Sequence, residues 1–333
     1  MMRGFRSLLD GRNSLALRIS NPKELRDLAQ RCMSINRIHE NANRLQAFAQ
    51  FMLGKGAFDH VVNNRQLGQA VQLANAVTSD WKNLWLAEGM GFSFGNFLLR
   101  HKTNLRAGEL RPVYLNKSLE LPWHTGIGLA FAARIVGQLG LESRSDQVAD
   151  ALRRYFSLCR HFAQPSYHGV VSEAIGLVVI TTRPDLLGKF CDALVNLPVE
   201  RNRFWHGVGR GSYFSSISFF PCLDLIETNF LNDCSACQDN PDLLNNYLAG
   251  VAWAITLVNL RNEEVSEEYR RKMKPNSFSH GESSAKELWR RWIGKQETAS
   301  SQKATSAEQL FSCLLYTSPS PRDRTRSRMP SSA

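Results

Sequence analysis

The sequence predicts an all-α protein in which repeated helical hairpins form either a solenoid or a closed α/α ring. Apolar residues recur at helical spacing in most segments, whereas the strict apolar–polar alternation of strands is scarce. In addition, five apolar segments carry two small residues placed two positions apart, at separations typical of helix–turn–helix repeats. Together these observations favour a helical repeat over a sheet-containing fold.

The first helix is expected to begin at Pro22, because Ser20 and Asn21 are capping residues and proline suits a first turn. Its apolar residues fall on one helical face: Leu25, Leu28, Cys32 and Ile35. Prolines and glycines separate many of the later helices. These are predicted over residues 41–61, 66–78, 80–100, 116–139, 145–162, 167–181, 183–196, 202–217, 241–262 and 283–294.

The paired small residues are the main feature of the pattern. They are Gly89 with Gly91, Gly126 with Gly128, Ala174 with Gly176, Gly207 with Gly209, and Gly250 with Ala252. Glycine inside a helix costs about 1 kcal/mol relative to alanine. Its repeated use therefore predicts a compensating close approach of neighbouring helices, although pairs arising by chance in a Gly/Ala-rich helical chain are the alternative.

The chain is expected to divide into four parts. Residues 1–19 form an N-terminal extension, and residues 20–273 form the helical repeat domain. Residues 274–312 contain an outlying amphipathic helix and a polar linker rich in Ser, Thr, Ala, Gln and Lys. Residues 313–333 are rich in Ser, Pro and Arg, and we expect them to be disordered.

This last segment, CLLYTSPSPRDRTRSRMPSSA, resembles translated sequencing-adapter read-through. It carries four arginines against one aspartate, so the net charge of +11 for the chain falls to +8 for residues 1–312. The densest basic clusters, at 270–272 and 290–291, are short and are typical of solvated helix faces. We therefore expect no specific nucleic-acid partner, and instead an unknown small molecule or protein.

No apolar run approaches the roughly 18–20 residues that a membrane span needs, since the stretch Val251–Leu260 is far shorter. The expectation is a cytoplasmic protein without a membrane span. Of the seven cysteines, Cys313 begins the C-terminal segment, and the other six are scattered and are expected to be free thiols. Cys234 and Cys237 form a pair, but without a second pair or nearby histidines they do not predict a zinc site.

No cofactor and no metal site are predicted. The sequence has no phosphate-binding loop, no dinucleotide fingerprint after a strand, no H-E-x-x-H motif and no G-x-S-x-G elbow. The segment Gly207–Gly211 is glycine-rich but lies in a helical, aromatic context. Common nucleotide-dependent and serine-hydrolase functions are therefore disfavoured.

Three polar residues nevertheless form a candidate catalytic set. Glu88, Glu173 and His206 each immediately precede the first small residue of a pair. Equivalent positions in stacked repeats face the same way, so the three side chains could converge and serve acid–base chemistry or hold a metal. The alternative is that each one caps a helix or satisfies a buried backbone group. His124 and His168 are nearby ligand-binding candidates.

Arg210 is a further ligand-binding candidate, because it follows Gly209 in a strongly apolar segment. A buried arginine needs a carboxylate, a helix C-terminus or a bound anion as its partner. A structural ion pair is the simpler expectation. The aromatic residues around it could instead line a ligand pocket.

Four segments resemble an uncharacterised bacterial family, a domain of unknown function encoded beside enediyne polyketide biosynthesis genes and elsewhere. They are AEGMGFSFG (87–95), PWHTGIGLAFA (122–132), FWHGVGRGSYF (204–214) and YLAGVAWAITL (247–257). The Arg3-Gly4-Phe5 and Gly54-Lys55-Gly56 stretches are also similar, so the resemblance spans roughly residues 3–262. Ala174 stands where the family usually has glycine. The resemblance implies a link to natural-product biosynthesis but no catalytic residues.

Two functions follow as hypotheses. The first is a binding or accessory protein that offers a concave helical surface to a small molecule or a partner protein. The second is an enzyme with Glu88, Glu173 and His206 in a helical cavity. Scattered or separately satisfied side chains favour the first, and convergence of the three in one closed pocket favours the second.

Overall fold

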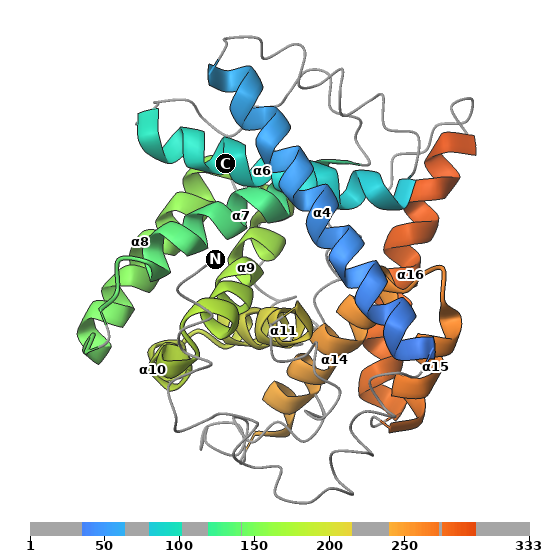
Figure 1. The fold of residues 1–333 in the computed structure, drawn as a ribbon. Coiled ribbons are helices and arrows are strands. Elements are labelled where there is room, and N and C mark those ends of the chain that lie inside the picture. The colour runs from blue at the N-terminus through green and yellow to red at the C-terminus, as the bar shows by residue number, and fades with distance from the viewer. Residues whose placement is uncertain are drawn as a thin grey trace, which may run out of the picture.

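The computed structural model describes residues 35–63, 80–101, 119–140, 142–214, 240–272 and 275–297, and every regular element in these ranges is helical (Figure 1). The all-α prediction is therefore confirmed for the described residues. The α-helices are α4 (Ile35–Asn63), α6 (Asp80–His101), α7 (Glu120–Val136), α8 (Ser145–Phe162), α9 (His168–Thr182), α10 (Leu187–Ala193), α11 (Pro198–Phe214), α14 (Pro241–Val258), α15 (Glu263–Lys272) and α16 (Pro275–Glu297). Two short 3₁₀ turns, η2 (Pro165–Tyr167) and η3 (Pro184–Leu186), precede α9 and α10.

Local sequence explains the bounds of these helices. The side chain of Asn240 caps α14 by accepting a hydrogen bond from the Asp242 amide at 3.1 Å, and Pro241 occupies the first turn. Helix α8 ends at Phe162, because Ala163 is extended and Pro165 follows two residues later. Prolines thus mark helix ends, as the sequence indicated.

Helices α4, α6, α7, α9, α11, α14 and α16 pack against one another in chain order, each on the next. Helix α8 packs on α7 and α10, at the edge of the molecule in Figure 1. The helices that carry the small-residue pairs are nearly all buried, and together they make one hydrophobic core.

The glycines of the small-residue pairs lie where neighbouring helices touch backbone to backbone. A methyl group at Gly89 of α6 would lie 1.9 Å from the Phe51 carbonyl oxygen of α4, and one at Gly91 would lie 2.0 Å from the Trp123 carbonyl oxygen of α7. The first small residue therefore faces the preceding helix and the second faces the following helix. The prediction that these pairs lie at close helix–helix contacts is confirmed.

The same contacts extend to two helices that the sequence pattern did not include. A methyl group at Gly54 of α4 would lie 2.0 Å from the Leu86 carbonyl oxygen, and one at Gly281 of α16 would lie 2.2 Å from the Ala249 carbonyl oxygen. Conversely, one pair has an alanine in place of its first glycine: Ala174 fits at its helix contact because Gly128 of α7 faces it and leaves room for its methyl group. Each close contact thus needs a small residue, but not always a glycine.

Helices far apart in the chain also meet. The Trp81 indole of α6 donates a hydrogen bond of 2.9 Å to the Leu257 carbonyl of α14. The Arg44 guanidinium of α4 donates one of 3.0 Å to the Tyr213 carbonyl of α11. The N-terminal helices therefore contact the C-terminal half of the molecule directly.

Some helix bounds differ from the sequence predictions. The helix expected over 116–139 comprises Glu120–Val136, and the one expected over 183–196 is a 3₁₀ turn followed by the short α10. The helix expected over 241–262 ends at Val258, and α15 is a separate helix that the pattern did not predict.

The helix predicted over 283–294 begins at Pro275, and its position in the fold also differs. The sequence placed it outside the packed body. The structure packs α16 along α14, with Phe278, Ala285 and Leu288 buried in the core. Its apolar face is therefore used inside the molecule, and the packed body continues beyond residue 273. The predictions for residues 20–34, 66–78, the Cys234–Cys237 pair and the C-terminal tail lie outside the described residues.

Candidate functional site

The close approach of α9 and α11 positions the first part of the site. A methyl group at Gly207 would lie 2.1 Å from the Glu173 carbonyl oxygen and 3.2 Å from the Glu173 Cγ atom. Any side chain at this position would therefore push Glu173 away from α11. Because residue 207 is a glycine, the carboxylate of Glu173 reaches the polar side chains on the same face of α11.

Glu173 lies between His206 and Arg210, both on α11. Its Oε1 atom accepts a hydrogen bond of 2.8 Å from Nη1 of Arg210 and lies 3.0 Å from Nδ1 of His206. All three residues are buried. Burial by itself would raise the pKa of Glu173, but the contacts with His206 and Arg210 outweigh it and lower the pKa to about 2. Glu173 is therefore ionised at neutral pH.

Glu88 of α6 belongs to the same region. The pKa of Glu88 is raised to about 7, and burial is the main cause. The charge of Arg210 acts in the opposite direction, and the charge of Glu173 adds to the increase. The Glu88 carboxyl therefore lies within electrostatic range of both residues. No hydrogen bond contributes to this shift. The two carboxylic acids are thus held in different states, because Glu173 has an arginine at hydrogen-bond distance and Glu88 does not.

Trp253 of α14 completes the group. The guanidinium carbon of Arg210 lies 4.2 Å from the centroid of the Trp253 ring, which is a cation–π contact. Arg210 Nε and Trp253 Nε1 are both buried and have no hydrogen-bond partner among the described residues. We refer to Glu88, Glu173, His206, Arg210 and Trp253 as the inner cluster.

The structure therefore brings Glu173 and His206 into contact and places Glu88 near them, as equivalent repeat positions implied. It also gives the buried Arg210 the carboxylate partner that its burial requires. Sequence reasoning missed Trp253. A signal was present, because Trp253 stands three residues after Gly250, just as Arg210 stands three residues after Gly207.

The other two candidate residues lie at the junction of α7 and α9 and have different neighbours. The His124 ring stacks on Tyr167 with 4.4 Å between ring centroids, and the Tyr167 hydroxyl donates a hydrogen bond of 2.8 Å to Glu120. Burial, with a smaller contribution from His168, lowers the pKa of His124 to about 3, so its ring is neutral. His168 Nε2 lies 3.1 Å from the Ala163 carbonyl oxygen. These contacts are typical of histidines that hold a helix junction together.

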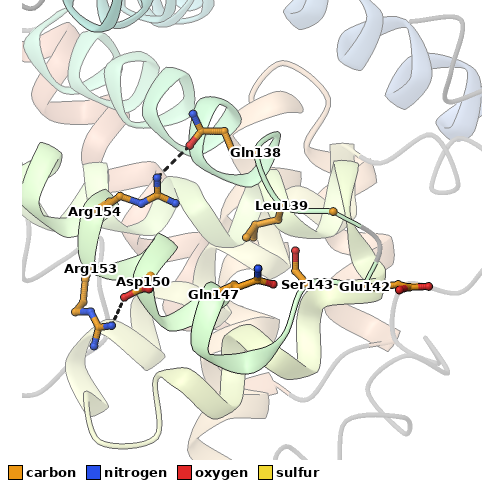
Figure 2. Close-up of a pocket in the computed structure, with 9 residues that line it drawn as sticks. Gln138, Leu139, Glu142, Ser143, Gln147, Asp150, Arg153 and Arg154 are labelled. Carbon is orange, nitrogen blue, oxygen red and sulfur yellow. Dashed lines mark hydrogen bonds and ion pairs between the residues drawn. The ribbon is translucent and has the colours of Figure 1, made fainter.

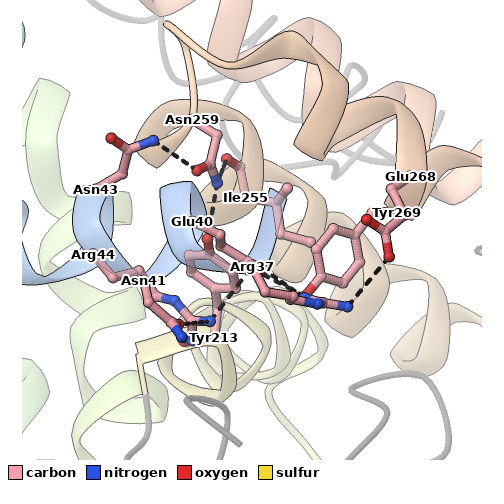
Figure 3. Close-up of polar contacts among 10 residues, drawn as sticks. All are labelled: Arg37, Glu40, Asn41, Asn43, Arg44, Tyr213, Ile255, Asn259, Glu268 and Tyr269. Atoms are coloured by element: carbon pink, nitrogen blue, oxygen red, sulfur yellow. Dashed lines mark hydrogen bonds and ion pairs between the residues drawn. The ribbon is translucent and has the colours of Figure 1, made fainter. Parts of the chain in front are cut away.

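A second buried polar network was not predicted by the sequence analysis (Figure 3). Glu40 of α4 accepts hydrogen bonds from Arg37, at 2.5 Å, and from the Tyr269 hydroxyl of α15, at 3.0 Å. Arg44, one turn further along α4, lies over the Tyr213 ring of α11 at 4.6 Å from its centroid. Although Arg44 Nε has no hydrogen-bond partner among the described residues, the other contacts tie α4 to α11 and α15, which indicates a structural role.

A cleft of about 610 Å³ lies at the turn between α7 and α8, and none of the predicted site residues lines it (Figure 2). Exposed polar side chains line most of it, and two of its charged groups, Asp150 and Arg153, form an ion pair. None of the residues that line the cleft belongs to the inner cluster, and none of them has a buried polar atom without a hydrogen-bond partner. The inner cluster therefore remains the stronger candidate.

Within the part of the chain that the structure describes, no group of three or more His, Cys, Asp and Glu side chains could hold a metal ion. No helix among the described residues is both long enough and apolar enough to cross a membrane. Comparison with known proteins gave no match to a protein-family model, to a curated protein or to a solved structure.

Proposed function

We propose that the chain is a binding or accessory protein that holds a small polar molecule at the inner cluster. The observation that carries this proposal is the set of unsatisfied groups there. Arg210 Nε and Trp253 Nε1 are buried donors without a partner among the described residues, and the buried Glu88 carboxyl lies near Arg210. Buried polar groups are nearly always hydrogen-bonded, so unsatisfied ones that lie together call for a ligand or bound water.

The groups that are free define the chemistry of the ligand. Two N–H donors select a carbonyl or hydroxyl oxygen, and the Glu88 carboxyl, with a pKa of about 7, can pair with a hydroxyl or amide N–H. Glu173 already balances Arg210, so a strongly anionic ligand has little charge left to pair with. A neutral molecule with neighbouring carbonyl and hydroxyl or amide groups fits best.

We propose that the chain-order packing of the helices curves into a closed α/α ring rather than an open solenoid. The hydrogen bonds that join α4 to α11 and α6 to α14 support this, because an open solenoid keeps such distant repeats apart. The resemblance to the enediyne-associated family supports a bacterial, cytoplasmic role in natural-product biosynthesis.

The test is to release and identify molecules that co-purify with the protein, by mass spectrometry after denaturation. Trp253→Phe removes one donor but keeps the ring, and Glu88→Gln removes the ionisable carboxyl. Both variants are expected to lose the molecule that the wild type retains. Glu120→Gln alters a buried carboxylate outside the inner cluster and serves as the matched control. If no molecule co-purifies, and none of a set of small carbonyl and hydroxyl compounds raises the wild-type Tm, the proposal is wrong.

A second candidate function, an enzyme, is favoured by one specific observation. Glu88 and Glu173 lie in one buried cluster with pKa values of about 7 and about 2. Such a pair can divide the roles of general acid and permanent anion. Here Glu88 would transfer the proton, and Glu173 would hold His206 and Arg210 in place. Conversion of the co-purified molecule by the wild type, with binding but no conversion by Glu88→Gln, would establish this function in place of simple binding.

A further inference from the structure

Helix α4 exposes a largely apolar face to solvent, on which His39 is also exposed. Five large apolar side chains are between 39% and 60% exposed: Ile38, Leu45, Phe48, Met52 and Leu53. Between the large residues lie the exposed small residues Ala42, Ala49 and Gly56. An exposed helix face normally carries charged and polar residues. The exposed face of α8 does so, with Asp150, Arg153, Arg154 and Arg160, so the composition of α4 is unusual within this chain.

The exposed residues of α4 follow a regular spacing. Steps of four, three, four, three and four join Ile38, Ala42, Leu45, Ala49, Met52 and Gly56, which we call the α4 seam. This is the spacing by which two helices pack knobs into holes. Over the seam, large and small residues alternate strictly. The seam spans roughly 27 Å at about 1.5 Å per residue, which is long enough for a helix–helix interface.

We infer that the α4 seam binds the same seam of a second copy of this chain, with the two helices antiparallel about a two-fold axis. With the axis at the level of residue 47, each large residue of the seam faces a small one of the other copy: Ile38 faces Gly56, Met52 faces Ala42 and Leu45 faces Ala49. A parallel pair in register would instead place large residues against each other. Self-complementarity of this kind is what a two-fold symmetric interface requires.

The size and charge of the face agree with a dimer. Five large side chains, each about half exposed, with the small residues between them, present roughly 500 Å² of apolar surface, so two copies would bury about 1,000 Å², the lower limit for a specific protein interface. Beside the seam, Lys55 is already paired with Asp59 at 2.9 Å. Lys55 would therefore enter the dimer already paired with a carboxylate of its own helix.

The opposite face of α4 is engaged within the molecule. Glu40, Arg44 and Ala47 are buried on this face, and Gly54 contacts the backbone of α6. The helix is thus held firmly while its seam faces outwards. By contrast, nothing lies within 4 Å of the position where a methyl group at Gly56 would stand. The seam is therefore open at the point where Ile38 of a second copy would enter.

The first experiment measures the mass of the full chain by sedimentation equilibrium over a range of concentrations. The wild type is expected to dimerise with a dissociation constant in the micromolar range, as suits an interface of this area. Leu45→Glu is expected to weaken dimerisation at least 100-fold without lowering the Tm, because Leu45 is exposed in the single chain. Val195→Glu, which changes an equally exposed apolar residue away from α4, should leave the dimer intact.

The second experiment tests the register. Chains carrying Leu45→Cys, mixed with chains carrying Ala49→Cys, should form an oxidised heterodimer faster than either variant forms a homodimer, with the wild type as the background for native cysteines. A wild type that stays monomeric up to about 100 µM would overturn the inference. So would a dimer that survives Leu45→Glu, or equal cross-linking in the mixed and unmixed samples.

Discussion

Replacing Gly209 by alanine is expected to destabilise this protein, although the same change in an exposed helix is stabilising. A methyl group at Gly209 would lie 2.0 Å from the Tyr247 carbonyl oxygen and 2.9 Å from the Val251 amide nitrogen. Both neighbours are backbone atoms of α14, so no side-chain rotation can relieve the clash. Helices α11 and α14 would have to separate by about 1.4 Å to restore ordinary contact.

The expected cost follows from this geometry. Overpacking of a core typically costs about 1–3 kcal/mol, and we expect Gly209→Ala to fall in the upper part of this range. This expected net cost already includes the opposing gain in helix propensity from glycine to alanine, which is up to about 1 kcal/mol. Gly209→Leu should cost more, since it adds further atoms to the same contact. Gly188→Ala is the control, because its methyl group would meet nothing within 4 Å, and it should be neutral or stabilising.

Denaturant unfolding followed by far-UV circular dichroism would measure these free energies. A further test uses Gly250→Ala, which changes the same helix pair, since its methyl group would lie 2.1 Å from the His206 carbonyl oxygen of α11. Once the helices have separated, the second methyl group should cost less, so the double variant should be less destabilised than the sum of the two single ones. An unchanged or increased stability of Gly209→Ala, or strict additivity, would refute the reasoning.

Three further predictions concern titration and the tail. The carboxyl of Glu88 keeps its proton up to about pH 7 in the folded state, so the free energy of unfolding of the wild type should fall by about 3 kcal/mol at most as the pH rises from 4.5 to 7. Glu88→Gln should remove this fall, as measured by urea unfolding at a series of pH values. The pH dependence due to His124 has the opposite sign. Its pKa is about 3 in the folded state and about 6.5 in the unfolded state, so the unfolded chain binds a proton first and stability falls as the pH drops below 6.5. His124→Phe, which keeps a ring on Tyr167, should lessen the loss between pH 6.5 and 4.5 by about 2–3 kcal/mol, and equal slopes for variant and wild type would contradict this. Truncation after Ser312 should leave the Tm of the protein unchanged in differential scanning calorimetry, and a clear drop would show that the tail contributes to folding.

The sequence by itself determined the helical class and the positions of close contact. Helical periodicity and proline breakers are local properties, so they predicted most helices within a few residues. The small-residue pairs predicted tight packing, because a glycine such as Gly207 inside a helix has a cost that only a close neighbour offsets. Equivalent repeat positions also indicated that Glu173 and His206 face the same region, which the structure places 3.0 Å apart.

Tertiary structure alone decided which groups pair across the fold. Arg44 and Tyr213 are 169 residues apart, and no local pattern joins them. The same holds for the contact between Arg210 and Trp253, which depends on how closely α11 and α14 approach. The physical reason is that helix formation depends on neighbouring residues, whereas the pairing and pKa values of buried polar groups depend on which distant helices exclude water from them. Glu88 and Glu173 each immediately precede the first small residue of a pair, yet only Glu173 has an arginine at hydrogen-bond distance.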